Sequence, residues 1–266
     1  MHTTSDGDRC FVFDCHTHLG EAAVFASYNL PTCFTPDDMV RLMDRHGVEA
    51  VCAFPPVEYG SDYEEVNTFN LREATAKHRG RIFPFVRLNP NIRQDPAASL
   101  SRSASMGAIG LKLHPLADGG YAVNDRSLVY PILEEARRAG LRVVLVHSGG
   151  HWGSTPALIA DVALDFKDLH FIVGHSGYQA LHHEAIAFAR RVENLWLDTA
   201  GMEFPFLVTR LVREVGKDRV LYGSDAPFGS FALEIAKVAE HAGLTAPEAR
   251  AVLGENLRRL LGLPFP

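Results

Sequence analysis

The residues of this chain with the most evident chemistry are histidines that stand at the ends of strand-like runs. The first run, "FVFDCHTH", carries His16 and His18 on one face, and three later runs end near His114, His147 and His175. Neutral imidazole is a common ligand of zinc and of other divalent transition metals. A single histidine at a strand end is usually a surface or hydrogen-bonded residue, so only the convergence of several would indicate a metal site.

The hydrophobic pattern predicts the elements that would bring them together. Eight strand-like runs recur, and several are continuously apolar, which is typical of parallel strands covered on both faces. They span residues 11–18, 50–56, 81–90, 108–115, 141–149, 169–177, 194–201 and 219–229. Eight β-then-α units in series predict an α/β fold with a single (β/α)8 TIM barrel over residues 11–266, for which about 250 residues is typical. A doubly wound open sheet is the alternative, and the evenness of the eight units favours closure.

Helical stretches separate the runs. Residues 35–47 begin with a Thr cap followed by proline and end on glycine, as helices commonly do. Residues 125–140 have helical apolar spacing and end on a basic turn and a glycine. We expect residues 245–264 to form a final helix that packs on the outside of the barrel, and residues 1–10 to be disordered.

A barrel of this kind collects the strand-end residues at one mouth. Its active sites lie at the carboxyl ends of the strands, where the βα loops meet, and the last run places Asp225 at the same end. The joint placement of His16, His18, His147 and Asp225 therefore predicts a metal site.

Strand geometry makes two further predictions, because side chains alternate between the faces of a strand. Phe171 and Val173 should point inward together with His175. Asp14 should share the inward face of His16, where it could orient a metal ligand or be a satisfied buried carboxylate.

Composition limits the classes of partner. The formal net charge of −6 gives no general attraction to nucleic acid, and no apolar run approaches the roughly 18–20 residues that cross a bilayer. The four cysteines show no paired spacing, which is typical of reduced thiols, and residues 1–10 show no apolar core of a signal peptide. We expect a cytoplasmic protein with a small-molecule substrate, no nucleic-acid partner and no membrane partner. A homo-oligomer is compatible with the sequence.

The motifs "DCHTH", "LKLHP", "VHSG", "GHSG" and "GSDAPFG", in this order over residues 11–229, resemble those of the amidohydrolase superfamily. Within it they are most similar to the amidohydrolase-related group that contains aminocarboxymuconate semialdehyde decarboxylase. The resemblance implies a divalent metal, most often one Zn²⁺, bound by His16, His18, His147 and Asp225. It also implies that His175 lies near the metal-bound water or the substrate. Asp225 could then take a proton from that water, and His175 could polarise a carbonyl or stabilise developing negative charge.

Other residues are candidates for substrate binding. Lys112 and His114 share one face of the fourth run, and Lys112 could bind a substrate carboxylate. In binuclear members of the superfamily the lysine on the fourth strand is a carbamate that bridges two metals, so a binuclear site with carbamylated Lys112 is an alternative. His114 could contact the substrate or act as an extra ligand.

Two further segments could reach a substrate. The loop "GGHWGS" would place His151 and Trp152 over the mouth, although Trp152 could simply pack. Arg87, at the end of the third run, could bind a carboxylate or form a loop salt bridge.

Three functions are compatible with these residues. The first, which we favour at this stage, is a zinc-dependent hydrolase that uses metal-activated water to cleave an amide, ester or lactone. The second is a nonoxidative decarboxylase, a carbon–carbon lyase that acts on a small carboxylated substrate. The third is a non-catalytic metal-binding scaffold. Ligand identity does not separate the first two, because both need the same metal ligands.

Overall fold

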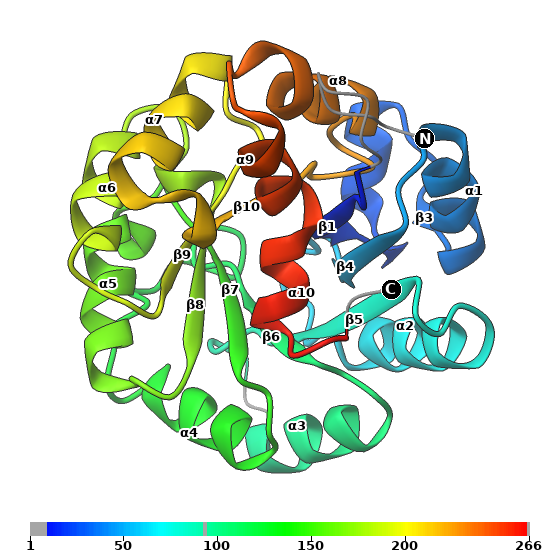
Figure 1. Ribbon diagram of the computed structural model, residues 1–266. Helices are drawn as coiled ribbons and strands as arrows, with labels where there is room; N and C mark the ends of the chain where they lie inside the picture. Colours follow the sequence, from blue (N-terminus) through cyan, green and yellow to red (C-terminus); the bar gives the residue numbers. More distant parts are fainter. Residues whose placement is uncertain (1–9, 93–94, 265–266) are drawn as a thin grey trace.

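The computed structural model describes residues 10–92 and 95–264, and eight parallel strands form its centre. The strands surround a common axis and the helices surround the strands (Figure 1). Their order in the sheet is β1 (Phe13–His18), β4 (Ala50–Phe54), β5 (Ile82–Arg87), β6 (Gly110–Leu113), β7 (Val143–His147), β8 (His170–Gly174), β9 (Leu195–Asp198) and β10 (Val220–Leu221). All eight coincide with the predicted runs.

The sheet closes between its first and last strands. The Cys15 backbone N–H donates to the Tyr222 carbonyl (2.9 Å), the Asp225 N–H to the His16 carbonyl (2.8 Å) and the His18 N–H to the Ala226 carbonyl (2.7 Å). The predicted single TIM barrel is therefore confirmed. Residues 1–9, which we expect to be disordered, lie outside the described residues. Cys10, the last residue of that predicted segment, is described and is buried.

Helices cover the outside of the barrel. They are α1 (Pro36–His46), α2 (Glu64–Lys77), α3 (Pro96–Ser105), α4 (Tyr130–Arg138), α5 (Pro156–Asp165), α6 (His182–Ala189), α7 (Pro205–Val215) and α8 (Phe231–Ala236). The predicted signals hold for α1, in which Thr35 and Asp38 form a capping box and Gly47 ends the helix at φ 63°. Helix α4 begins five residues later than predicted, because the Asp125 carboxylate accepts from the N–H groups of Ser127 and Leu128 and holds a turn there.

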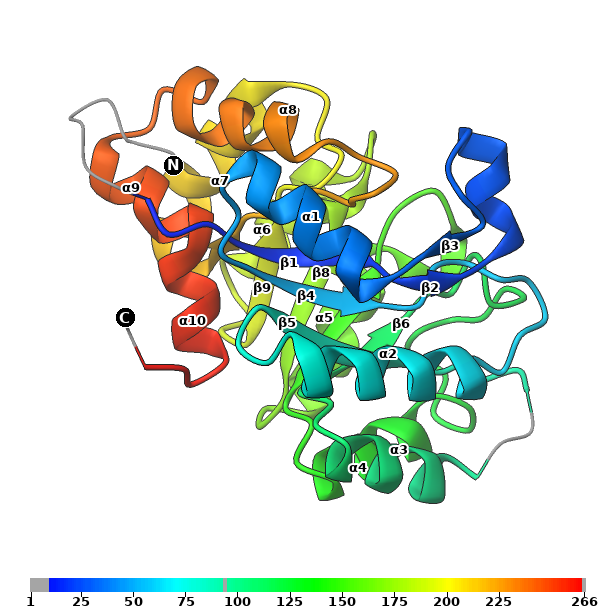
Figure 2. The same cartoon turned by 90° about the vertical axis from the view of Figure 1, so that its right-hand side faces the viewer.

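The C-terminal segment forms α9 (Ala246–Arg250) and α10 (Asn256–Leu260), joined by a π-helical turn at Ala251–Glu255. Leu257 belongs to the apolar cluster inside the barrel, and Leu260 packs against that cluster. The predicted C-terminal packing helix is therefore present, and α10 packs against the end of the barrel opposite the mouth. Figure 2 shows α10 at one end and the short hairpin of β2 (Gly20–Glu21) and β3 (Cys33–Phe34) at the other.

Both predictions from strand alternation are wrong, and each has a local cause. In β1, Asp14 pairs with Val51 and Thr17 with Ala53, so two residues oppose one at a β-bulge. The bulge lets both Cys15 and His16 face the barrel interior and leaves Asp14 beside Val51 in the outer layer.

In β8 the residue inside the barrel is Ile172, whereas Phe171 and Val173 belong to the outer layer. His175 still reaches the mouth because it follows the strand in a left-handed conformation with φ 59°.

The described helices include none that is long and apolar enough to span a membrane. All four cysteines are free thiols, as their spacing predicts.

Candidate metal centre at the barrel mouth

A cavity of about 490 Å³ opens at the carboxyl ends of the strands. Seven of the ten site residues that the sequence indicates line it, namely His16, His18, Lys112, His114, His147, His175 and Asp225. They come from five different strands or the loops that follow them, so the barrel brings together residues that lie more than two hundred positions apart.

Three of these side chains form a compact group that could hold a metal ion. The Asp225 Oδ1 atom is 2.9 Å from the His18 Nε2 and 3.5 Å from the His16 Nε2. Ligands bound to one transition-metal ion at about 2.1 Å are themselves separated by about 3 to 3.5 Å in tetrahedral or octahedral geometry. The spacing and the nitrogen and oxygen donors therefore fit a divalent cation.

Asp198, at the end of β9, orients His16 from behind, and the sequence reasoning missed it. The His16 Nδ1–H donates to Asp198 Oδ2 at 2.8 Å, which leaves Nε2 with its lone pair toward Asp225 and His18. A carboxylate behind a ligating histidine is the arrangement that fixes its tautomer in metal sites. The available signal was the aspartate in the second half of the seventh run, "NLWLDTAG". Burial raises the pKa of Asp198 to about 6, so the group is mainly ionised at neutral pH.

His175 is held by the same loop. Its Nδ1–H donates to the Ala200 carbonyl at 3.0 Å and its backbone N–H to Asp198 Oδ1 at 2.8 Å. The nitrogen left available to the cavity is therefore Nε2. His175 also forms, with His16 and Asp198, a second group of metal-ligand type within the described residues.

His114 and His147 lie beside these groups. Their rings stack at 3.9 Å, and the His147 ring meets that of His175 at 4.8 Å. The two metal-ligand groups found among the described residues do not include His147. Its role as a ligand stays a prediction.

The electrostatics of the cavity favour the protonation states that metal binding needs. Burial, with the charge of Lys112, lowers the pKa of His16, and burial also lowers the pKa of His18, His114 and His147. These imidazoles are therefore neutral at pH 7, as metal ligands must be. Burial alone would raise the pKa of Asp225, but the hydrogen bond with His18 and the neighbouring histidines hold it below its usual range.

Lys112 stands directly beside these ligands. Its side chain is fully buried, with Nζ 3.4 Å from the His16 Nε2 and 4.4 Å from the centre of the Phe54 ring. Burial and the charge of Arg87 lower the pKa of Lys112 to about 7. The group can therefore exist as an ammonium or as an amine near neutral pH.

Three predicted residues lie away from the cavity lining. Arg87 is fully buried, donates to Asp118 Oδ1 at 2.8 Å and to the Pro55 carbonyl at 3.2 Å, and lies over the Tyr63 ring. Its guanidinium forms a buried ion pair with Asp118 and does not line the cavity. Of the two predicted roles, Arg87 therefore has the salt bridge and not the substrate contact.

His151 and Trp152 lie at the rim beside Gly150, which does line the cavity. Their rings are 4.9 Å apart, and Trp152 is 67% exposed. Any contact of these two residues with a substrate stays a prediction.

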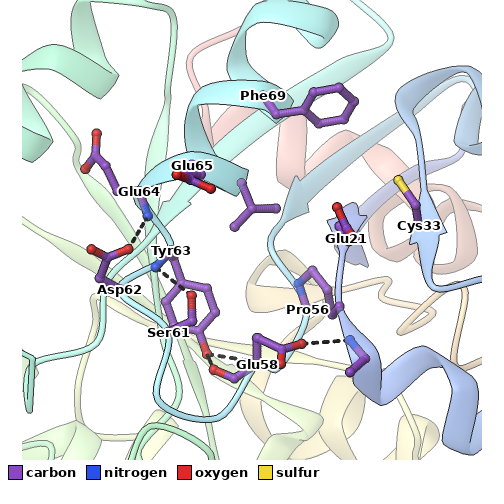
Figure 3. Close-up of a pocket in the computed structure, with 13 residues that line it drawn as sticks. Glu21, Cys33, Pro56, Glu58, Ser61, Asp62, Tyr63, Glu64, Glu65 and Phe69 are labelled. Atoms are coloured by element: carbon purple, nitrogen blue, oxygen red, sulfur yellow. Dashed lines mark hydrogen bonds between the residues drawn. The ribbon is translucent and has the colours of Figure 1, made fainter.

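A second cavity, of about 780 Å³, lies between α2 and the β2–β3 hairpin (Figure 3). Its lining is acidic, with Glu21, Glu58, Asp62, Glu64 and Glu65, and includes no histidine. It is larger than the cavity at the mouth, but both metal-ligand groups found among the described residues lie at the mouth, which is therefore the candidate site.

Comparison with known proteins identifies the family. The amidohydrolase family model matches residues 13–263, nearly the whole chain. This chain belongs to the amidohydrolase family. The resemblance seen in the sequence motifs is thus confirmed, and no curated protein matches this amidohydrolase.

Solved structures share its fold at low sequence identity. The 2,6-dihydroxybenzoate decarboxylase from Rhizobium is 17% identical with a TM-score of 0.74, covering 96% of this chain and 99% of that one. A dihydroxybenzoic acid decarboxylase from Polaromonas with bound manganese and the inhibitor 2-nitroresorcinol is 16% identical, with a TM-score of 0.73 and coverages of 96% and 97%. A probable 2-pyrone-4,6-dicarboxylic acid hydrolase from Acinetobacter baumannii is 14% identical, with a TM-score of 0.72 and coverages of 95% and 99%. At these identities the likeness shows the fold alone.

Proposed function

We propose that this amidohydrolase is a metal-dependent, nonoxidative decarboxylase of a small aromatic carboxylic acid. The observation that carries the proposal is the composition of the cavity at the mouth. It combines one cationic pole, formed by Lys112 beside the candidate metal ligands, with a wall of apolar and aromatic side chains: Val24, Tyr28, Val57, Tyr59, Leu116, Tyr178 and Phe228. Such a cavity suits a flat molecule with one anionic end.

The structural relatives support the lyase more than the hydrolase that the sequence reasoning favoured. Two of the similar structures are decarboxylases of dihydroxybenzoates, and one of them contains manganese. The hydrolase remains the second candidate, because a probable lactone hydrolase has the same fold and Asp225 is placed to act as a base toward water.

We assign the cation to His16, His18 and Asp225, with His147 as a fourth ligand. Zinc is the metal expected from the sequence, and manganese is the metal bound by the Polaromonas relative. When bound, a divalent ion supplies positive charge that attracts substrate oxygens. We propose one ion, and carbamylation of Lys112 for a second ion stays the alternative.

Side chains of the protein would then bind the substrate carboxylate and deliver the proton that the reaction needs. Decarboxylation breaks the bond between the ring carbon and the carboxylate, releases carbon dioxide and leaves an electron pair on that carbon, to which a proton must be delivered. Lys112 would hold the carboxylate through its ammonium form before the bond breaks. The His175 Nε2 and the Asp225 carboxylate are the two groups at the mouth that we propose to carry the proton.

The experiment is a product assay on protein loaded with manganese or zinc. The protein is incubated with 2,6-dihydroxybenzoate and with 2-pyrone-4,6-dicarboxylate, and both carbon dioxide and the remaining organic acids are measured. His183→Asn, an exposed helical histidine, is the matched control for His16→Asn. Carbon dioxide release that is lost in His16→Asn and retained in His183→Asn supports the proposal. Ring-opened acid without carbon dioxide would instead favour the hydrolase.

A further inference from the structure

The cavity at the mouth contains one acidic residue that neither the candidate metal ligands nor the proposed proton transfer explains. Glu234, on α8, lines the cavity, and its side chain is 15% exposed. Among the described residues that line the cavity, Lys112 is the only lysine or arginine. The charge of this cavity is therefore unevenly distributed, with one cation and a carboxylate that is separate from Asp225.

Glu234 and Lys112 are carried by elements on opposite sides of the barrel. Lys112 lies on β6, the fourth strand in the order of the sheet, and α8 follows β10, the eighth strand. Positions four apart in a ring of eight strands face each other across the axis. A molecule that places one end at Lys112 therefore extends toward Glu234.

Lys237 fixes Glu234 but does not offer its charge to a ligand. Its Nζ donates to the carbonyl oxygens of Thr199 (2.9 Å) and Met202 (3.0 Å) and to Glu234 itself. These three acceptors use all three N–H groups of the ammonium, and Lys237 is buried. Burial, opposed by Lys237, raises the pKa of Glu234 to about 7, so about half of this carboxylate is ionised at pH 7.

We infer that Glu234 determines specificity by rejecting a second carboxylate. The substrate then carries a single carboxylate, bound at the Lys112 end, and presents a hydrogen-bond donor such as a hydroxyl or amino group toward Glu234. A second carboxylate on the same ring would meet Glu234 and an apolar wall with no free cation, which is an unfavourable burial of charge. The inference rests on the proposed function, because it names the substrate class for that site.

The test compares two acids that differ in one substituent. In 2-hydroxyterephthalate, the 4-hydroxyl of 2,4-dihydroxybenzoate is replaced by a carboxylate opposite the first one. Their dissociation constants are measured by calorimetry at pH 7, where the ammonium form of Lys112 and the ionised form of Glu234 are both populated. The manganese-loaded protein is used, as the wild type, Glu234→Gln and Glu240→Gln. Glu240 is an exposed acid on the helical continuation of α8 and serves as the matched control.

We expect the wild type to bind the monoacid at least tenfold more tightly than the diacid. Glu234→Gln, which keeps an acceptor for Lys237, should reduce the ratio of the two dissociation constants about tenfold, and Glu240→Gln should leave the ratio unchanged. The inference would be overturned if the wild type bound both acids equally, preferred the diacid or bound neither. It would also be overturned if Glu234→Gln left the ratio unchanged. Because binding is measured apart from turnover, a preserved preference without carbon dioxide release would refute the decarboxylase alone.

Discussion

Replacement of Asp198 by asparagine tests how the protein prepares His16 for a metal. The side chain accepts three hydrogen bonds, from the backbone N–H groups of His175 and Ala200 at Oδ1 and from the His16 Nδ1–H at Oδ2. In Asp198→Asn the amide oxygen can keep both backbone donors, so the amide nitrogen would face His16. Two donors cannot pair, and the His16 proton should therefore move from Nδ1 to Nε2, the nitrogen that faces Asp225.

The size of the effect follows from this change of tautomer. Loss of a carboxylate behind a ligating histidine typically weakens metal binding or activity 10- to 100-fold, which corresponds to about 1.4 to 2.8 kcal/mol of binding free energy. The charge of Asp198 disappears as well, which removes an attraction to the cation. We expect the dissociation constant for manganese or zinc to rise by about one to two orders of magnitude.

The assay is a competition titration with a chelator of known affinity. Asp161→Asn is the matched control, since Asp161 is exposed and its carboxylate accepts a hydrogen bond from Asn124, far from the candidate ligands. Circular dichroism establishes that each variant is folded. If folded Asp198→Asn bound the metal as tightly as Asp161→Asn, the proposed role of Asp198 would be refuted.

Three further predictions concern charge inside the barrel. Arg87→Leu leaves the buried Asp118 carboxylate with the Tyr63 hydroxyl but without its cationic partner, and should lower the free energy of unfolding by about 3–5 kcal/mol. Arg87→Leu combined with Asp118→Asn should lower it by less, and equal losses in urea unfolding would contradict this. Burial raises the folded-state pKa of Glu234 from 4.5 to about 7, so its protonated form stabilises the fold below pH 4.5 and this contribution is lost as pH rises through 7. The free energy of unfolding of the metal-free wild type, relative to that of Glu234→Gln, should therefore fall by about 2 kcal/mol between pH 5 and 8. If the free energies of unfolding of the two proteins changed equally with pH, this prediction would be wrong. His175→Asn should keep most of the metal but lower turnover by about 10²–10³-fold; loss of the metal would make His175 a ligand.

The sequence predicts the barrel and most of its mouth because both depend on short-range patterns. Apolar runs, caps and glycines are local, and the order of strand-end histidines is visible without coordinates. Asp198 was missed because a lone aspartate after "LWL" carries no spacing signal until β9 is placed behind His16. The sequence also left open whether Arg87 binds a substrate or forms a salt bridge, because its partner Asp118 lies 31 positions away.

Strand alternation failed where the backbone departs from a regular strand. The bulge in β1 shifts Asp14 out of the interior, and the left-handed conformation of His175 separates it from the alternation of β8. Both departures lie at the candidate site, where irregular backbone aims side chains at the mouth. A period-two rule cannot anticipate either of them.

The most direct test of this account is the metal content of the purified protein. After dialysis against manganese or zinc and removal of the free ion, elemental analysis should find about one divalent ion per chain in the wild type and a small fraction of that in His16→Ala and Asp225→Ala, while His183→Asn retains its ion. A wild type that binds no ion, or variants at His16 and Asp225 that keep it in full, would contradict the central claim.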